Sequence, residues 1–320
     1  MRASHTSTAR AVVFPGQGAQ RQGMAQDCFE SFAESRRVFD TVSEAIGVDM
    51  AQLCFEEDER LHQTEFTQPA ILTAEIAMWR AIKKRYNFEA KYFGGHSLGE
   101  YAALVAAGVI PLGDAAQIVH KRGALMQQAA PPRSGAMAAL IYDNILQCDF
   151  LDIVHQAGAQ VANYNSLQQV VISGPKTAVE TAESDLKQRY PDMRVIFLDV
   201  SAPFHCSLMD GIAEEFEGCL RAFEGSFNLE RATCVLSNYA GGFHKGETLI
   251  EHLVCQASGS VQWVTNMERL KEVADSVFEI GPTRVLGKFC AEVGIPVNTI
   301  VGMRTLRKHL GECETDGLQE

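Results

Sequence analysis

Residues 90–107 read AKYFGGHSLGEYAALVAA and carry the strongest signal for the fold. Residues 90–94 predict a short strand, and the alanine-rich residues 100–107 predict a helix. Between them, residues 95–99 match G-x-S-x-G, a turn that lifts a serine hydroxyl out of a sheet. The pentapeptide is common, but a position between strand and helix is the context that this chemistry requires. Ser97 is therefore a candidate nucleophile; the alternative is a glycine-rich packing turn with a surface serine.

A glycine turn near the amino terminus is a candidate for part of an oxyanion hole. Residues 11–14 (AVVF) predict a buried strand, which ends in residues 15–20 (PGQGAQ). Such a turn can present the Gln17 amide to the point where the helix after Ser97 presents the Leu98 amide. The amino-terminal end of a helix favours negative charge there. The alternative for residues 15–20 is an ordinary surface turn.

A serine nucleophile needs a base. Successive side chains of a strand point to opposite faces, so we expect His96 to point away from the Ser97 hydroxyl. His205 follows the last strand of a predicted insert, where two subdomains would meet. Solvated or helix-surface positions explain five other histidines: His5, His120, His155, His252 and His309. Sequence position favours His205 without excluding the rest.

Arg122, in the stretch KRG, has two interpretations. The sequence alone favours a solvated helix residue. A guanidinium lowered into an acyl site would instead hold a carboxylate by two parallel hydrogen bonds and select acids with a free carboxyl end.

The periodicity changes along the chain and predicts two structural units. Large apolar residues between Phe29 and Ile46 recur on one helical face, and a further helix begins near Thr67 with Pro69 in its first turn. The region after residue 135 predicts the β-α-β-β-α-β order of a ferredoxin-like unit, with elements at 136–141, 145–156, 159–163, 169–173, 177–188 and 194–200. We therefore expect one discontinuous catalytic subdomain over 1–130 and 201–320, with residues 131–200 as the insert.

Composition excludes several classes of protein. The 320 residues are 46% hydrophobic and 21% charged, as in globular proteins, and the net charge of -12 lacks the basic character of nucleic-acid binders. The nine cysteines show no C-x-x-C spacing, which predicts no zinc site and favours a reducing cytoplasm. The sequence shows no signal peptide. Its apolar runs are all much shorter than the ~18 residues of a membrane helix, so we expect no membrane association.

Seven motifs together resemble the malonyl-CoA:acyl carrier protein transacylase family, of the type that serves fatty-acid synthesis or acts in trans on polyketide synthases. They are residues 14–20 (FPGQGAQ), 67–70 (TQPA), 95–101 (GHSLGEY), 122–127 (RGALMQ), 162–166 (ANYNS), 204–209 (FHCSLM) and 279–282 (EIGP). The resemblance implies an α/β fold in which an α/β-hydrolase-like large subdomain carries an inserted ferredoxin-like small subdomain.

The resemblance also implies a role for each matched residue. Ser97 would be the nucleophile, His205 the general base and acid, Arg122 the clamp for the malonyl carboxylate, and the Gln17 and Leu98 amides the oxyanion hole. Backbone carbonyls, one of them from Gln256, would orient the histidine in place of an aspartate. Phe204 would leave no room for an α-methyl group, which makes methylmalonyl a poorer substrate.

The resemblance implies a ping-pong reaction that transfers a malonyl group from malonyl-CoA to an acyl carrier protein. It implies no metal and no bound organic cofactor, and it implies that the enzyme is a monomer. The sequence departs from the family at residues 260–263, where SVQW replaces Pro-Val-Arg-Trp, and at Leu167, where proline or alanine is usual. Because carrier proteins are usually acidic, docking would need a basic patch. Two patches are candidates: Lys187 with Arg189, and Arg304 with Arg307 and Lys308.

Two other functions remain open. One is an acyl hydrolase of the same fold that clears stalled acyl groups from carrier proteins, which would gain nothing from a carboxylate clamp. The other is an inactive homologue that only docks on a synthase complex, against which the complete set of site residues argues. The pathway, fatty acid or polyketide, is not determined by the sequence.

Overall fold

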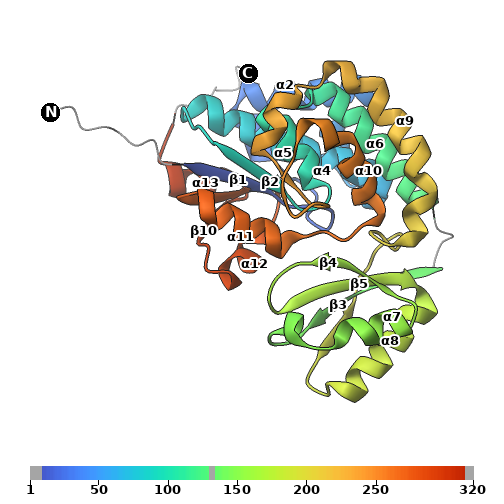
Figure 1. Cartoon of the computed structure of the whole chain (residues 1–320). Coiled ribbons are helices and arrows are strands. Elements are labelled where there is room, and N and C mark those ends of the chain that lie inside the picture. The colour runs from blue at the N-terminus through green and yellow to red at the C-terminus, as the bar shows by residue number, and fades with distance from the viewer. Residues whose placement is uncertain (1–8, 130–133, 314–320) are drawn as a thin grey trace.

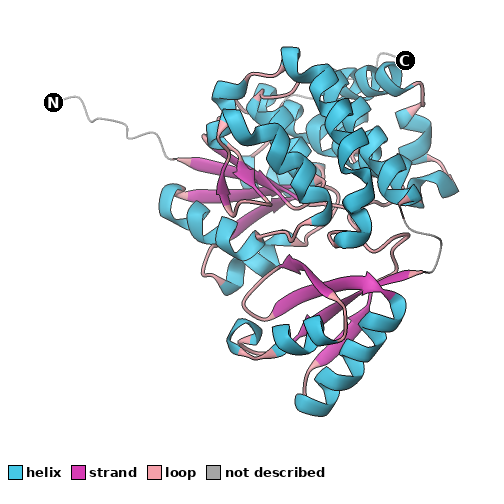
Figure 2. Ribbon diagram, turned by 45° about the vertical axis from the view of Figure 1, so that its right-hand side comes forward, coloured by secondary structure: helices cyan, strands magenta, loops and turns pink. Residues whose placement is uncertain are grey.

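Two separate four-stranded sheets organise the molecule (Figures 1 and 2). The computed structural model describes residues 9–129 and 134–313, so the boundary expected near residue 131 falls outside the described residues. The larger sheet has the order β10-β9-β1-β2, and its strands are all parallel. Its strands are β1 (Arg10–Phe14), β2 (Tyr92–Gly95), β9 (Ser276–Ile280) and β10 (Val297–Ile300). Both ends of the chain thus contribute to one sheet.

Helices cover the larger sheet. They are α1 (Gln26–Ser31), α2 (Ala33–Ile46), α3 (Met50–Phe55), α4 (Thr64–Arg85), α5 (Gly99–Ala107), α6 (Leu112–Gln128), α9 (Ala213–Phe223), α10 (Leu249–Ser258), α11 (Trp263–Val273), α12 (Leu286–Glu292) and α13 (Met303–Leu310). A short antiparallel pair, β7 (Leu236–Ser237) with β8 (Gly242–Phe243), lies beside them. Parallel strands buried under helices on both faces are typical of α/β folds.

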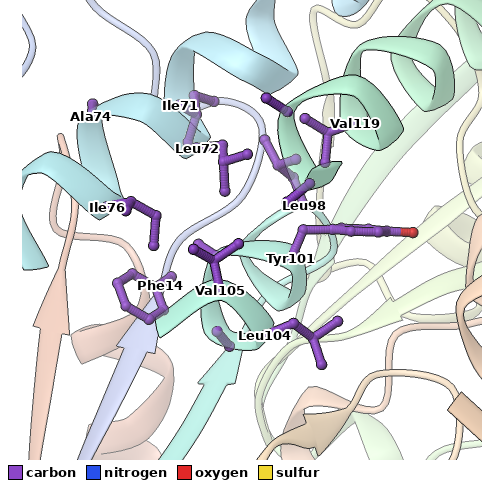
Figure 3. Close-up of a cluster of buried hydrophobic side chains, with 14 of the residues drawn as sticks. Phe14, Ile71, Leu72, Ala74, Ile76, Leu98, Tyr101, Leu104, Val105 and Val119 are labelled. Atoms are coloured by element: carbon purple, nitrogen blue, oxygen red, sulfur yellow. The ribbon is translucent and has the colours of Figure 1, made fainter. Parts of the chain in front are cut away.

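The main hydrophobic core joins β1 to the helices of the large unit, among them α4, α5 and α6. Figure 3 shows Phe14 of β1 in one cluster with side chains of α4, α5 and α6, among them Ile76, Tyr101 and Val119. Each fully buried large apolar side chain contributes about 1.5–3 kcal/mol to stability. Helix α4 is buried over most of its length, so it forms the centre of this layer.

The segment between the two halves of the large unit forms the second sheet. Its strands are β3 (Gly135–Ile141), β4 (Gln160–Tyr164), β5 (Gln169–Pro175) and β6 (Arg194–Phe197), with helices α7 (Phe150–Gln156) and α8 (Lys176–Arg189). The order β4-β5-β3-β6 with antiparallel neighbours is the ferredoxin-like arrangement expected from the sequence. A core of its own includes Leu140, Phe150, Ile172 and Leu186.

The residues that depart from the family pattern lie where the two sheets meet. The Ser260 hydroxyl donates to the Val161 carbonyl at 2.5 Å, and Val261 bridges in parallel to Asn163 at the edge of β4. Leu167 lies partly exposed in the turn between β4 and β5.

Several element boundaries differ from those predicted. The helix expected through residues 29–46 breaks at Phe32, which is extended (φ -135°, ψ 128°) and fully buried. Residues 145–156 form a short 3-10 turn (Ile145–Gln147) followed by α7, and the last strand of the insert ends at Phe197 instead of residue 200. Strands β7, β8 and β10 were not expected. Across the described residues, no helix has the length and apolar character needed to span a membrane.

The start of α4 is a further correction. The helix begins at Thr64, so Pro69 lies inside it and not in its first turn. Helix α6 packs directly on the added turn, because a Cβ at Gly123 would lie 2.5 Å from the Thr64 carbonyl oxygen. The Thr67 hydroxyl also donates to the Leu61 and Gln63 carbonyls and stabilises this turn.

Candidate active site

Ser97 lies in a sharp turn between β2 and α5. Its φ of +51° is a left-handed conformation that non-glycine residues seldom adopt. The turn is this tight because both flanking glycines contact backbone: a Cβ at Gly95 would lie 2.0 Å from the Gly99 carbonyl, and a Cβ at Gly99 would lie 2.2 Å from the Phe14 carbonyl oxygen. The Asn238 side-chain oxygen accepts from the Ser97 amide at 2.7 Å and holds the turn.

His205 contacts the Ser97 hydroxyl. The distance from its Nε2 to Ser97 Oγ is 2.7 Å, and its φ of +58° is also left-handed. Nδ1 lies 2.8 Å from the Gln256 carbonyl oxygen and 3.2 Å from that of Gly259. Because carbonyls only accept hydrogen bonds, Nδ1 carries the proton and Nε2 can accept one from the serine. Backbone carbonyls thus orient the ring, where other triads use an acid.

His205 is a neutral base in the folded protein. Burial, and then the positive charge of Arg122, lower the pKa of His205 from 6.5 to about 3. The ring is only 4% exposed, so desolvation of the imidazolium is the larger cause.

His96 points elsewhere, as strand geometry predicts. Its Nε2 lies 2.8 Å from the Asn165 side-chain oxygen, and its ring lies against Trp263 with a centroid separation of 5.5 Å. His96 therefore links the turn before Ser97 to the end of β4.

Arg122 is buried at the same centre and is not a solvated helix residue, being 1% exposed. Its Nη1 donates to the Gln68 side chain at 2.9 Å, and its Nη2 donates to the Gln256 side chain at 2.8 Å and to Ser97 Oγ at 3.3 Å. The guanidinium also lies over the Tyr101 ring at 5.4 Å. Within the described part of the chain Arg122 forms no ion pair with an acid, and its Nε has no hydrogen-bond partner. The buried Glu100 carboxylate acts on the guanidinium only across Gln256, so Arg122 lacks a directly bonded acid until a ligand supplies one.

The two expected oxyanion donors, Gln17 and Leu98, belong to two turns that pack on each other. A Cβ at Gly16 would lie 2.3 Å from the His96 carbonyl oxygen, so the Gln17 turn packs directly on the serine turn. The Gln17 side chain donates to Thr64 Oγ1 at 3.1 Å. Leu98 is the N-cap of α5, and neither its amide nor that of Gln17 donates a hydrogen bond to any described residue.

Phe204 is mostly buried beside His205, at 7% exposure, and packs into the main core.

Sequence reasoning missed three polar residues of this centre. Gln68 and Glu100 stand in motifs that were recognised, yet their spacing gives no sign that they meet Arg122 and Gln256. Asn238 lies in a loop without periodicity, about 140 residues from the turn that it holds. Only the fold brings them together.

A strained serine at the carboxyl end of a parallel strand, with a histidine on its hydroxyl and free amides in the adjoining turns, is typical of enzymes that transfer acyl groups through a serine ester. Residues 11–240 match the family model described as acyl transferase domain. A malonyl CoA-acyl carrier protein transacylase of Staphylococcus aureus is 35% identical over 312 residues, covering 96% of this chain and 99% of the relative. One from Bacillus subtilis is 36% identical over 281 residues, which cover 86% of this chain and 69% of that relative. The chain belongs to the malonyl CoA-acyl carrier protein transacylase family.

Solved structures agree. The transacylase of Clostridium perfringens superposes with a TM-score of 0.87 at 36% identity, covering 94% of this chain and 96% of that one. A malonyl-transacylase in complex with its type II PKS acyl-carrier protein superposes with a TM-score of 0.87 at 33% identity, covering 95% and 99%. The α/β fold with its ferredoxin-like insert is therefore that of the family.

Proposed function

We propose that this protein transfers a malonyl group from malonyl-CoA to the phosphopantetheine thiol of an acyl carrier protein, through a malonyl ester on Ser97. The observation that carries the proposal is the state of Arg122. Its guanidinium is buried, has no acidic partner among the described residues, and lies 3.3 Å from the Ser97 hydroxyl. A malonyl group esterified to that hydroxyl has its free carboxylate only one methylene beyond the ester carbonyl, within reach of this cation. Arg122 thus selects the acyl group by its charge.

In the first half-reaction Ser97 Oγ attacks the thioester carbonyl while His205 Nε2 takes the hydroxyl proton. The carbon–sulfur bond then breaks, and His205 returns the proton to the departing thiol of CoA. In the second half-reaction the carrier thiol gives its proton to His205 and attacks the malonyl ester, and Ser97 recovers the proton as it leaves. The acyl group passes from thiol to oxygen to thiol, with no net gain or loss of protons.

The Gln17 and Leu98 amides would bind the oxyanion of both tetrahedral intermediates. Because the thioester is already activated, the proposal assigns no metal or organic cofactor. Phe204 beside the base disfavours an acyl group with an α-methyl branch.

Substrate charge would also tune the base. The Arg122 cation is the second cause of the low pKa of His205. A malonyl carboxylate bound to Arg122 cancels much of that charge, so the pKa of His205 rises toward the working pH when the correct acyl group is present.

Three further features belong to the proposal. One chain supplies Ser97, His205 and Arg122, so a monomer suffices. All nine cysteines are free, which supports a reducing, cytoplasmic location. The pathway is either fatty-acid or polyketide synthesis.

The acyl hydrolase and the inactive docking homologue remain the alternatives, and one assay separates all three. The protein is mixed with malonyl-CoA or acetyl-CoA, with and without holo carrier protein, and acyl-Ser97, acyl-carrier and free acid are followed by mass spectrometry. The proposal predicts malonyl-Ser97 in excess over acetyl-Ser97, and malonyl-carrier once carrier is added. Rapid free-acid release from acyl carriers would establish the hydrolase, and absence of any acyl-Ser97 the docking homologue.

A further inference from the structure

A buried polar network lies behind Ser97, with the carboxylate of Glu100 at its centre. Glu100 is fully buried in the first turn of α5. Its Oε2 accepts from the Asn238 backbone amide at 3.0 Å and from the Gln256 side-chain nitrogen at 2.8 Å. Both partners are themselves in contact with the reactive turn.

Asn238 and Gln256 connect Glu100 to the site, because each forms hydrogen bonds with Glu100 and with the turn around Ser97. Asn238 accepts from the Ser97 amide and donates to the Gly95 carbonyl, each at 2.7 Å. The Gln256 side chain donates to the Ser97 carbonyl at 2.9 Å and accepts from Arg122 at 2.8 Å. Its side-chain nitrogen is shared between Ser97 and Glu100, so the position of the carboxylate sets the rotation of the amide that Arg122 binds.

Among the described residues, the second oxygen of Glu100 has a single partner, the imidazole of His244. The distance from His244 Nε2 to Glu100 Oε1 is 2.7 Å, and both side chains are completely buried. The His244 backbone amide donates to the Val235 carbonyl at 2.9 Å, which fixes the ring's attachment just after β8. Since the carboxylate accepts, Nε2 is the donor. No sequence motif includes this histidine.

We infer that His244 is a positioning residue for malonyl selection: by holding one oxygen of Glu100, it keeps the other oxygen on Gln256, and thereby keeps Arg122 in place for the malonyl carboxylate. Without this donor the buried carboxylate loses one of its three hydrogen bonds and can rotate toward another partner. Gln256 then follows Glu100, and the guanidinium loses the acceptor that aligns it. This inference rests on the proposed function, because it concerns the discrimination between malonyl and acetyl groups.

The chain offers a matched set of variants. Glutamine at position 244 places an amide nitrogen near the position of histidine Nε2, whereas asparagine is too short to reach Glu100. His244→Gln and His244→Asn are thus both polar and neutral, and they differ in the donor to Glu100. His252→Gln is the control, because the His252 ring packs on His244 at 5.7 Å but makes no hydrogen bond to the network.

The measurement is the single-turnover rate of Ser97 acylation by malonyl-CoA and by acetyl-CoA, on variants whose circular dichroism matches wild type. We expect the malonyl-to-acetyl ratio of rates to fall about tenfold in His244→Asn, and to stay within about twofold of wild type in His244→Gln and His252→Gln. A lower content of active enzyme would reduce both rates equally and leave the ratio unchanged.

An unchanged ratio in folded His244→Asn would overturn the inference. So would a tenfold loss in His244→Gln, a result that can be read even where His244→Asn does not fold. If wild type forms no malonyl-Ser97, the proposed function itself fails; if wild type does so and the variants retain its ratio, only the role of His244 fails.

Discussion

Arg122 and Glu75 are both buried, and neither forms an ion pair with any residue that the structure describes, but they differ in what surrounds them. Arg122 lies among the amide oxygens of Gln68 and Gln256 and over the Tyr101 ring, groups that stabilise a cation. Glu75 lies in the middle of α4, and neither of its carboxylate oxygens accepts a hydrogen bond from any residue within 9–129 and 134–313. Burial, and then the nearby Glu279, raise the pKa of Glu75 well above its ordinary value, so it is held as the neutral acid.

A buried ionisable group is either kept charged by polar neighbours or made neutral by a change of protonation. Around Glu75, protonation costs less free energy than burial of the charge, so the carboxyl group becomes an uncharged part of the core. Around Arg122, whose guanidinium keeps its proton near neutral pH, polar groups hold the charge beside the Ser97 hydroxyl. Arg122 therefore remains a cation beside the Ser97 hydroxyl, whereas Glu75 is held neutral in the core.

Arg122→Ala removes the cation and should cost ~3–5 kcal/mol of transition-state binding, or two to four decades in malonyl transfer. Acetyl transfer should suffer far less, because an acetyl group has no carboxylate to leave unpaired. The measurement is kcat/KM for both acyl-CoA substrates. Lys121→Ala, at the exposed neighbouring position, is the control and should leave both values unchanged. Equal losses with both substrates in Arg122→Ala would show that Arg122 is not the clamp.

His205→Gln should remove an acid sensitivity of stability. The pKa of His205 is about 3 in the folded state and near 6.5 in the unfolded chain. Between these values the unfolded state binds more protons, so the free energy of unfolding falls as pH falls, on the order of 1 kcal/mol per pH unit.

Urea denaturation between pH 7 and pH 4 would measure this slope in wild type and variant. His205→Gln should flatten it, while His155→Gln, at an exposed position on α7, should not. A wild-type slope that persists in His205→Gln would rule out His205 as its source.

Glu75 should give stability a pH dependence opposite in sign to that of His205, and Glu75→Gln should remove it. Because the folded-state pKa of Glu75 is raised, the folded protein binds the extra proton, and stability is lost as pH rises above about 4.5. Glutamine cannot ionise. The free energy of unfolding of the variant, relative to that of wild type at the same pH, should therefore be higher at pH 8 than at pH 5.

The gain for Glu75→Gln is on the order of 1 kcal/mol for each pH unit until the folded-state pKa is reached. The exposed Glu89→Gln is its control. A difference between Glu75→Gln and wild type that does not vary with pH would mean that Glu75 is ionised in the folded protein.

Carrier docking should give the smallest effect, since surface charges contribute little each. Lys187 and Arg189 are already paired with Glu183 and Asp149. Of the α13 cations, Arg307 is paired with Glu312, whereas Arg304 and Lys308 form no ion pair with any residue in the described ranges. Arg304→Glu with Lys308→Glu should therefore slow transfer to the carrier about three- to tenfold and leave Ser97 loading intact. A larger loss from reversing Lys187 and Arg189 would move the docking surface to α8.

The parts that the sequence predicts are those written in local patterns. The strand, turn and helix around Ser97 follow from the glycines and from hydrophobic periodicity, and the insert follows from its alternating elements. The break at Phe32 could not be seen, because its side chain continues the apolar face of the helix. Strand β10 is short, and Asn298 and Thr299 interrupt its apolar character.

The site was harder to predict because its members are distant in sequence. Nothing local distinguishes Arg122 from a solvated helix residue; its burial depends on α6 packing against α4 at Gly123. His205 reaches Ser97 because the chain returns from the insert to the large unit after β6. Asn238 and His244 have no pattern of their own, and in the sequence Glu75 is a single acid within an apolar run.

The most direct test of the central claim is a crystal structure of the protein after reaction with malonyl-CoA in the absence of carrier. The account predicts an ester on Ser97 Oγ, with its carbonyl oxygen on the Gln17 and Leu98 amides and its free carboxylate in two hydrogen bonds to Arg122. An ester on another residue, or a carboxylate that points away from Arg122 into solvent, would contradict it.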